Sequence, residues 1–167
     1  MAIRRIIVYP DPVLLSQAQA VAKITRRVRR LARDMLETMF AAPGVGLAAP
    51  QVGARQRVIV VDAGEGPITL VNPQIKAAEG KQIGLEGCLS LPDLVGEVRR
   101  SAWVVVSGLD LGGKPITVEG EGLLARAFQH EVDHLDGILF VVRVQDPACI
   151  WRTDELKASV QKEVVHI

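Results

Sequence analysis

Residues 129–137 decide both the fold and the chemistry that this sequence predicts. They read Gln129-His130-Glu131-Val132-Asp133-His134-Leu135-Asp136-Gly137. Two histidines four residues apart lie on one face of a helix, so both imidazoles can bind the same metal ion. The glutamate between them is turned away from that line and can transfer a proton without being a ligand. The stretch is therefore typical of a helix in a metal-dependent hydrolase.

The same pattern also has a purely structural interpretation. Histidine pairs on helices are often solvated surface residues or hydrogen-bonded core groups. A His-Glu-x-x-His match arises by chance in on the order of one chain in a few hundred of this length. Two histidines are also too few ligands for a catalytic ion, so metal binding requires a third ligand from elsewhere in the chain.

Composition indicates a soluble globular protein. Of the 167 residues, 49% are apolar and 23% charged, which excludes wholesale disorder. A net charge of +1 gives no general attraction to nucleic acid or acidic membranes. We find no signal peptide, no apolar run near the ~20 residues of a membrane span, and too few cysteines for a disulfide framework. We therefore expect one domain over residues 1–167, located in the cytoplasm.

Apolar spacing and turn residues predict the elements along the chain. Three helices are expected, from Thr25 to Phe40, from Gly122 to Leu135 with Gly137 as the stop, and from Thr153 to Val164. Strands are expected at 57–62, 68–71, 73–78, 97–109, 114–119 and 138–142. Helices separate from antiparallel-type strands indicate an α+β fold with one helix buried against the sheets.

No downstream residue is a convincing third ligand. His166 stands near the end of the sequence, where chains are usually mobile. A zincin protease would use a downstream acid, but Glu155 and Glu163 fall on a polar helix and are better interpreted as solvated surface residues.

Cys88 is a better candidate for the third ligand. It lies in Leu85-Glu86-Gly87-Cys88-Leu89-Ser90-Leu91-Pro92, which we expect to be a glycine-containing loop between extended segments. A buried cysteine is usually an inert small hydrophobe. Beside a histidine pair that lacks a ligand, however, its thiolate completes a four-coordinate site with one open water position. Cys149 has no polar context and is predicted to be structural.

The stretch Gly44-Val45-Gly46-Leu47-Ala48-Ala49-Pro50-Gln51 contributes further polar groups. Its Gly-x-Gly-x-x-Ala pattern imitates a dinucleotide-binding motif, which needs a strand before it and a helix after it. Here a helix precedes the glycines and Pro50 interrupts the segment after them, which disfavours a nucleotide site. The glycines permit close approach of a ligand, and the Gln51 amide can donate to an oxyanion.

Together these three stretches resemble the motifs of the peptide deformylases. Gly-x-Gly-Leu-Ala-Ala-x-Gln, Glu-Gly-Cys-Leu-Ser and Gln-His-Glu-x-Asp-His-Leu-x-Gly occur intact and in order at 44–51, 86–90 and 129–137. The similarity extends from about Ile6 to Phe140. It implies an α+β domain whose central metal-binding helix is packed against antiparallel β-sheets.

The resemblance also implies the role of each site residue. The metal ligands would be Cys88, His130 and His134. Glu131 would be the catalytic acid and base, and Gln51 with the Leu89 backbone N–H would bind the oxyanion. Residues bordering the substrate's methionine would be Val45, Gly46, Leu123, Ala127 and His130.

By the same resemblance, the protein removes the formyl group from N-formylmethionine at the start of newly synthesised polypeptides and releases formate. The cofactor would be one divalent metal ion, Fe(II) in the cell, with Zn, Ni or Co as alternatives. The ribosome near its exit tunnel is a candidate partner, whereas no membrane and no specific nucleic acid are expected as partners.

Two features depart from the family pattern. Arg100 stands where the family has an arginine that pairs with the position of Asp133, but Arg99 replaces the proline that commonly precedes it. The segment from about Arg143 onward matches no family pattern.

Two other functions remain open at the level of the sequence. A zincin-like endopeptidase would cleave unformylated peptides internally and would tolerate Cys88→Ser. A binding module associated with the ribosome or a chaperone would use the metal structurally, but such a site needs a fourth protein ligand.

Overall fold

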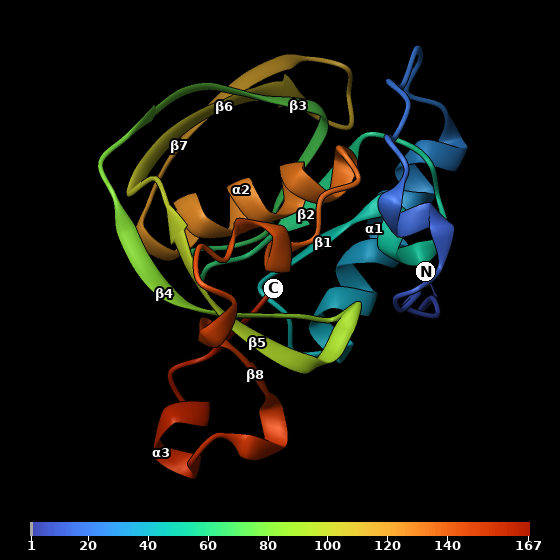
Figure 1. Cartoon of the computed structure of the whole chain (residues 1–167). Coiled ribbons are helices and arrows are strands. Elements are labelled where there is room, and N and C mark those ends of the chain that lie inside the picture. The colour runs from blue at the N-terminus through green and yellow to red at the C-terminus, as the bar shows by residue number, and fades with distance from the viewer. Residues whose placement is uncertain (1) are drawn as a thin grey trace.

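A computed structural model describes residues 2–167 and shows an α+β architecture (Figure 1). Helix α2 (Gly122–Leu135) lies at the centre, with strands of one sheet on one side and strands of a second sheet on the other (Figure 1). This arrangement confirms the expected fold class. Within residues 2–167, no helix is both long enough and apolar enough to cross a membrane.

The first sheet has five antiparallel strands in the order β1-β2-β3-β6-β7. Its strands are β1 (Gly46–Ala48), β2 (Val58–Val61), β3 (Ile68–Glu79), β6 (Trp103–Leu109) and β7 (Pro115–Glu121). All four residues of β2 are buried, as expected for a β-branched run covered on both faces.

The second sheet has four strands in the order β8-β5-β4-β9. They are β4 (Gln82–Cys88), β5 (Leu91–Arg100), β8 (Ile150–Arg152) and β9 (Val165–His166). Strand β9 runs parallel to β4, and the other pairs are antiparallel. β4 and β9 therefore bring the end of the sequence beside Cys88.

The remaining elements are helical. They are α1 (Arg26–Ala41), α3 (Ala158–Gln161) and the 3₁₀ turns Pro12–Leu15, Ala49–Val52, Phe140–Arg143, Pro147–Cys149 and Thr153–Glu155. Thr25 caps α1, because its side chain accepts a hydrogen bond from the Val28 N–H. Met35 and Met39 on the apolar stripe of α1 are fully buried, in the same apolar cluster as Val58 and Val60 of β2.

Helix α2 is buried between the two sheets because it carries small and apolar side chains that pack there. Ala125, Ala127 and Phe128 are completely buried in the apolar cluster that also contains residues of β2, β3 and β6. Gly137 follows the helix with φ +73°, and a Cβ there would meet the Leu15 carbonyl oxygen at 2.7 Å. This glycine therefore fixes where the helix ends.

The two long helices and the strands β2, β3, β6 and β7 occur where the sequence predicts strands or helices, but the expected strands at 68–71 and 73–78 form one bulged strand. The sequence patterns do not predict β1, β8 or β9. At the bulge Asn72 has φ +53°. Its side chain bonds the N–H and the C=O of Val21, which ties the bulge to the chain before α1.

The prediction of one strand at 97–109 is also wrong. The range contains the end of β5 and all of β6, which belong to different sheets. The Gln129 side chain accepts from the N–H of Ser101 and donates to its C=O, so this residue leaves the sheet ladder. Arg99, in place of proline, is regular strand paired with Ile83.

Three further differences concern the site and the end of the chain. The stretch around Cys88 is strand β4 rather than a loop, so the loop is reduced to Leu89 and Ser90. The expected strand at 138–142 is a 3₁₀ turn, because Phe140 packs beneath His130. The expected helix at 153–164 is helical only at α3 and the short turn before it, since this polar segment has no apolar stripe to bury.

Asp34 ties the start of the described chain to α1. Its carboxylate accepts from the Ala2 N–H and the Arg4 Nε, both at 2.9 Å, and its side chain is 4% exposed. Burial alone would raise the pKa of Asp34, but the hydrogen bonds from Ala2 and Arg4 together lower it below its ordinary value.

We expect Asp34→Asn to destabilise the protein at pH 7 by about 1–2 kcal/mol, a fall in Tm of roughly 2–8 °C. The pKa of the carboxyl is lower in the folded protein than in the unfolded chain. Its contribution is therefore complete above the unfolded pKa of about 3.9 and is lost as the pH falls through the folded pKa.

Thermal unfolding followed by circular dichroism from pH 3 to pH 7 measures this difference. The exposed Asp93→Asn is the matched control and should unfold like the unmodified chain. A difference that stays constant over the pH range would contradict the prediction.

Candidate metal centre

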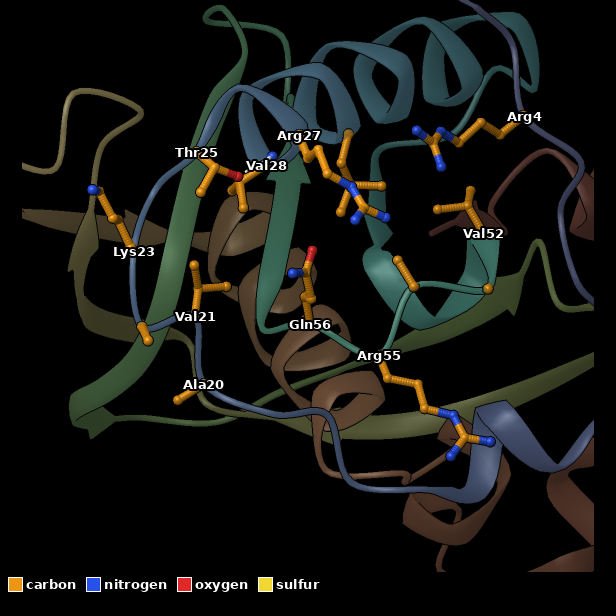
Figure 2. Close-up of a pocket in the computed structure, with 14 residues that line it drawn as sticks. Arg4, Ala20, Val21, Lys23, Thr25, Arg27, Val28, Val52, Arg55 and Gln56 are labelled. Carbon is orange, nitrogen blue, oxygen red and sulfur yellow. Dashed lines mark hydrogen bonds between the residues drawn. The ribbon is translucent and has the colours of Figure 1, made fainter.

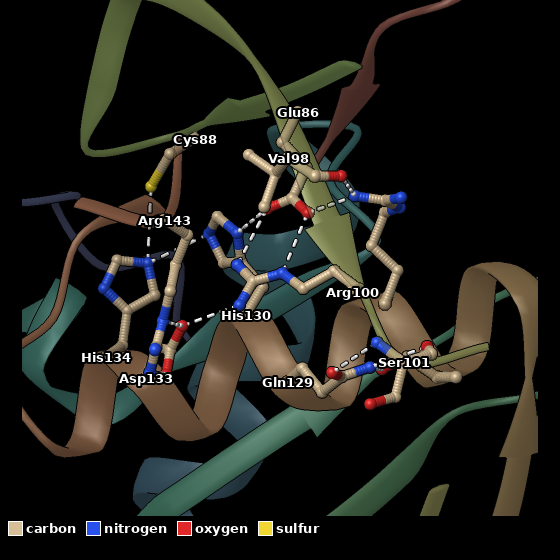
Figure 3. A network of polar contacts seen from close by, with 12 residues as sticks. Glu86, Cys88, Val98, Arg100, Ser101, Gln129, His130, Asp133, His134 and Arg143 are labelled. Carbon is tan, nitrogen blue, oxygen red and sulfur yellow. Dashed lines mark hydrogen bonds and ion pairs between the residues drawn. The ribbon is translucent and has the colours of Figure 1, made fainter. Parts of the chain in front are cut away.

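Three potential ligands meet between β4 and α2. The Cys88 Sγ lies 3.3 Å from the His134 Nε2, which lies 3.2 Å from the His130 Nε2 (Figure 3). All three ligand atoms lie within 4.8 Å of one another, and all three residues are buried. The structure therefore brings together the three ligands that the sequence predicts, two from one helix face and one from the strand opposite.

Glu86 orients His130. The Glu86 Oε1 lies 2.8 Å from the His130 Nδ1 (Figure 3). A proton on Nδ1 donates to this carboxylate and leaves the lone pair of Nε2 pointing at the ligand cluster. Phe140 stacks on the His130 ring, with ring centroids 6.1 Å apart.

The Glu86 carboxylate is itself completely buried and is held by two arginines. Arg100 donates to both of its oxygens at 2.9 and 3.0 Å, and Arg126 donates to Oε2. Burial would raise the pKa of Glu86, but hydrogen bonds from His130 and Arg100 lower it well below its ordinary range. The group is therefore an anion beneath the metal ligands.

Arg100 extends this network to α2. It donates to the Asp133 Oδ2 at 2.7 Å, which confirms the pairing that the resemblance implies. Arg143 donates to both oxygens of Asp133 at 2.8 and 3.1 Å. The sequence patterns assign no role to Glu86, Arg126 or Arg143. For Glu86 a signal existed, because a residue two positions before Cys88 in a strand faces the same side of the sheet.

Glu131 lies between the histidines in sequence but packs against β1. A Cβ at Gly46 would meet the Glu131 Oε1 at 2.5 Å, so only glycine leaves room for this carboxylate. Both carboxylate oxygens and the His134 Nδ1 are buried, and none of the three has a hydrogen-bond partner among residues 2–167. Burial, and next the charge of Glu86, raise the pKa of Glu131 well above its ordinary value.

These unpaired groups fit a bound cation with its water. Buried polar atoms are normally hydrogen-bonded, and a two-His, one-Cys donor set suits a four-coordinate divalent ion with one open position. Burial and the nearby Glu131 raise the pKa of Cys88 to about 12, so the free site holds a neutral thiol. A cation at the site supplies the charge that stabilises the thiolate.

Gln51 is fixed with its amide nitrogen toward the ligands. Its Oε1 accepts from the Ala48 N–H at 2.9 Å, which assigns the orientation of the amide. Its Nε2 lies 3.7 Å from the Cys88 Sγ and 3.2 Å from the Ser90 Oγ. The site therefore holds a buried amide donor, three ligands and an unpaired carboxylate.

Comparison with known proteins agrees with this geometry. Residues 3–148 match the sequence model of the family described as polypeptide deformylase. The chain belongs to the polypeptide deformylase family.

The curated relatives include the peptide deformylase of Halothermothrix orenii, which is 56% identical over 136 residues, 80% of this chain and 88% of that protein. The peptide deformylase of Alkaliphilus metalliredigens is 54% identical over 86% of this chain and 98% of its own length. The solved peptide deformylase of Thermotoga maritima superimposes with a TM-score of 0.85 at 41% identity, over 87% of this chain and all of that one.

This membership establishes the activity as peptide deformylation, with formylated nascent peptides as the substrate class. The endopeptidase and the structural metal module are thereby set aside. The deformylase match ends at residue 148, so residues 149–167 lie outside it.

The residues expected to border the deformylase substrate come from α2, from β1 and from the residue before β1. Ala127 is completely buried, and Val45 packs against the same apolar cluster. Gly46 faces the Glu131 carboxylate. Leu123 is 38% exposed and lines a hollow of about 620 Å³ together with Ile68.

A larger hollow of about 680 Å³ lies away from the ligands, beside the start of α1 (Figure 2). Its lining includes Arg4, Thr25, Arg27, Arg55 and Gln56 but no metal ligand. We assign no deformylase role to this hollow.

Cys88→Ser is expected to lower metal content well below one ion per chain, because a serine hydroxyl stays protonated and is a much poorer ligand than a thiolate. Cys149→Ser is the matched control, since Cys149 is a free cysteine outside the cluster. Elemental analysis of both anaerobically purified variants measures the difference. Equal metal content in the two variants would remove Cys88 from the ligand set.

Proposed function

We propose that Glu131 is the acid and base of the deformylation reaction. The observation that supports this role is its carboxylate on the helix that carries both histidine ligands. It is completely buried and has no hydrogen-bond partner in the described part of the chain. When bound, a divalent ion held by Cys88, His130 and His134 makes water a nucleophile near neutral pH. Glu131 accepts a proton from the attacking water and passes it to the departing amine.

The oxyanion is held by the Gln51 amide and the Leu89 backbone N–H. The orientation of the Gln51 side chain supports this, because its oxygen is occupied by Ala48 and its nitrogen lies beside Cys88. Leu89 directly follows Cys88, so its N–H is close to the ligands through the chain itself. Donors fixed before the reaction lower the barrier because they need no reorganisation.

The substrate's methionine side chain lies against Val45, Gly46, Leu123 and Ala127. The small size of Ala127 and the apolar character of Val45 suit a thioether side chain beside α2. The partial exposure of Leu123 supports a position at the rim rather than at the base of such a pocket.

We further propose Fe(II) as the metal in the cell, with Zn, Ni or Co able to replace it. The ligand set accepts all four ions, so anaerobic purification with metal analysis tests the assignment.

Because newly synthesised polypeptides emerge from ribosomes, we place the enzyme in the cytoplasm and at the exit tunnel. Cosedimentation with ribosomes carrying formylated nascent chains tests that contact.

We expect Glu131→Gln to abolish catalysed formate release, lowering its rate by about 10²–10⁴-fold or more. The reason is that the amide cannot accept the proton of the attacking water. The metal content should be retained. Formate release from a formyl-Met tripeptide is measured on samples of known metal content. The exposed Glu155→Gln serves as control; full activity of Glu131→Gln would overturn the assignment.

Gln51→Met should lower kcat by about 10²–10³-fold with a small change in KM. Methionine keeps the volume but lacks the N–H that stabilises the charge developing in the transition state. Steady-state kinetics with the same tripeptide separate the two parameters. An effect on KM alone would assign Gln51 to substrate binding rather than to the oxyanion.

A further inference from the structure

The last residues of the sequence fold back into the centre of the molecule. After α3, which projects from the body, the chain returns to end beneath α2 and next to β1 (Figure 1). Strand β9 pairs there with β4, with Glu86 opposite Val165 and Gly87 opposite His166. We call residues 164–167 the tail strand.

The tail strand is hydrogen-bonded to both sheets. On the β4 side, the Ile167 N–H donates to the Gly87 carbonyl oxygen at 3.1 Å, and the Leu89 N–H donates to the Ile167 oxygen at 3.2 Å. On the β1 side, the Val45 N–H donates to the His166 carbonyl oxygen at 3.0 Å. The segment is therefore the edge strand of the second sheet and is also bonded to the residue before β1, the edge strand of the first.

Its side chains alternate as in a regular strand. Ile167 is completely buried in the apolar cluster that contains Ala127, and Val165 packs against that cluster. On the opposite face, the absence of a side chain at Gly87 makes room for the tail strand. A Cβ there would meet the His166 Nδ1 at 2.9 Å and Val164 at 3.4 Å. Both faces of the tail strand are thus accommodated.

The groove that holds this segment has the properties of a peptide-binding site. Without the tail strand, β1 and β4 would present unpaired N–H and C=O groups to each other, beside Cys88. Exposed strand edges bind extended peptides by adding a strand. The same groove holds Val45, Ala127 and the Leu89 N–H, which we assign to the substrate.

The tail strand is also outside the part of the chain shared with the relatives. The family match ends at residue 148, and the Thermotoga maritima chain is covered completely by 87% of this one. The catalytic machinery is therefore complete without residues 164–167.

We propose that residues 164–167 are an intramolecular occupant of the substrate groove, which a formylated peptide must displace. The inference rests on the proposed function, because it uses the assigned substrate groups. While the tail strand is bound, the Leu89 N–H is occupied by Ile167 and the Val45 N–H by His166, so a peptide cannot use them. Only the fraction of molecules with the tail strand detached binds substrate.

Two variants release the tail strand by different means. One ends after Glu163, and the other is the full chain with Ile167→Asp, which places a carboxylate where a buried apolar side chain now lies. Both are expected to lower KM for a formyl-Met tripeptide by about tenfold, as for a groove that is ~90% closed, with kcat unchanged. Ser159→Asp, an exposed position in α3, adds the same charge without releasing the strand and should leave KM unchanged.

A synthetic peptide of sequence Val-Val-His-Ile should inhibit the shortened enzyme competitively and restore the higher KM. Three results would overturn the proposal. The first is an unchanged KM in both variants, and the second is no inhibition by this peptide. The third is a fall in both kcat and thermal stability. The last result would make the tail strand a structural part of the fold.

A second measurement does not depend on catalysis. The Ile167 amide should exchange its hydrogen faster when the full chain is saturated with a Met-tripeptide product, because the bond to Gly87 is broken. Unchanged exchange at saturation overturns the displacement. If no metal-loaded variant releases formate but exchange is accelerated, the proposed function fails while the occupancy of the groove stands.

Discussion

The buried carboxylate of Glu86 is the constraint on which the rest of the site depends. It binds Arg100 from β5 and both Arg126 and His130 from α2, so one charge joins three elements. Taking a carboxylate out of water costs several kcal/mol unless its partners are in place. Register between β4, β5 and α2 is therefore restricted to the arrangement that satisfies this group, and that arrangement also places Cys88 opposite the histidines.

The network also explains why the ligands can be arranged before a metal is bound. His130 is held by Glu86 and Phe140, and Asp133 on the same helix is held by Arg100 and Arg143. Helix α2 therefore has little freedom to rotate. The ligand atoms converge because their supporting contacts are satisfied, which is how surrounding hydrogen bonds commonly tune metal sites.

The metal ligands could be predicted because their signals are local. The spacing of His130 and His134 is a property of one helix. Cys88 follows from the chemistry of a thiolate beside a histidine pair that lacks a ligand, and the three short motifs agree with it. The missed features depend on contacts distant in sequence. The local sequence of β4 predicts a loop, because the contact that holds Glu86 comes from Arg126, 40 residues away. The break between β5 and β6 at Ser101 depends on hydrogen bonds with Gln129, and no sequence pattern near Ser101 predicts it.

The order of residues 164–167 also depends on contacts distant in sequence, so local patterns do not predict it. The usual mobility of chain ends disfavours His166 as a ligand, yet its backbone is paired on both sides. Ordering four residues costs about 4–8 kcal/mol of backbone entropy. Burial of Ile167 and Val164 returns roughly 3–6 kcal/mol, and the hydrogen bonds of Ile167 and His166 add about 0.5–1.5 kcal/mol each. These opposing contributions are of similar size, so the tail strand is held weakly enough for a peptide that makes the same contacts to replace it.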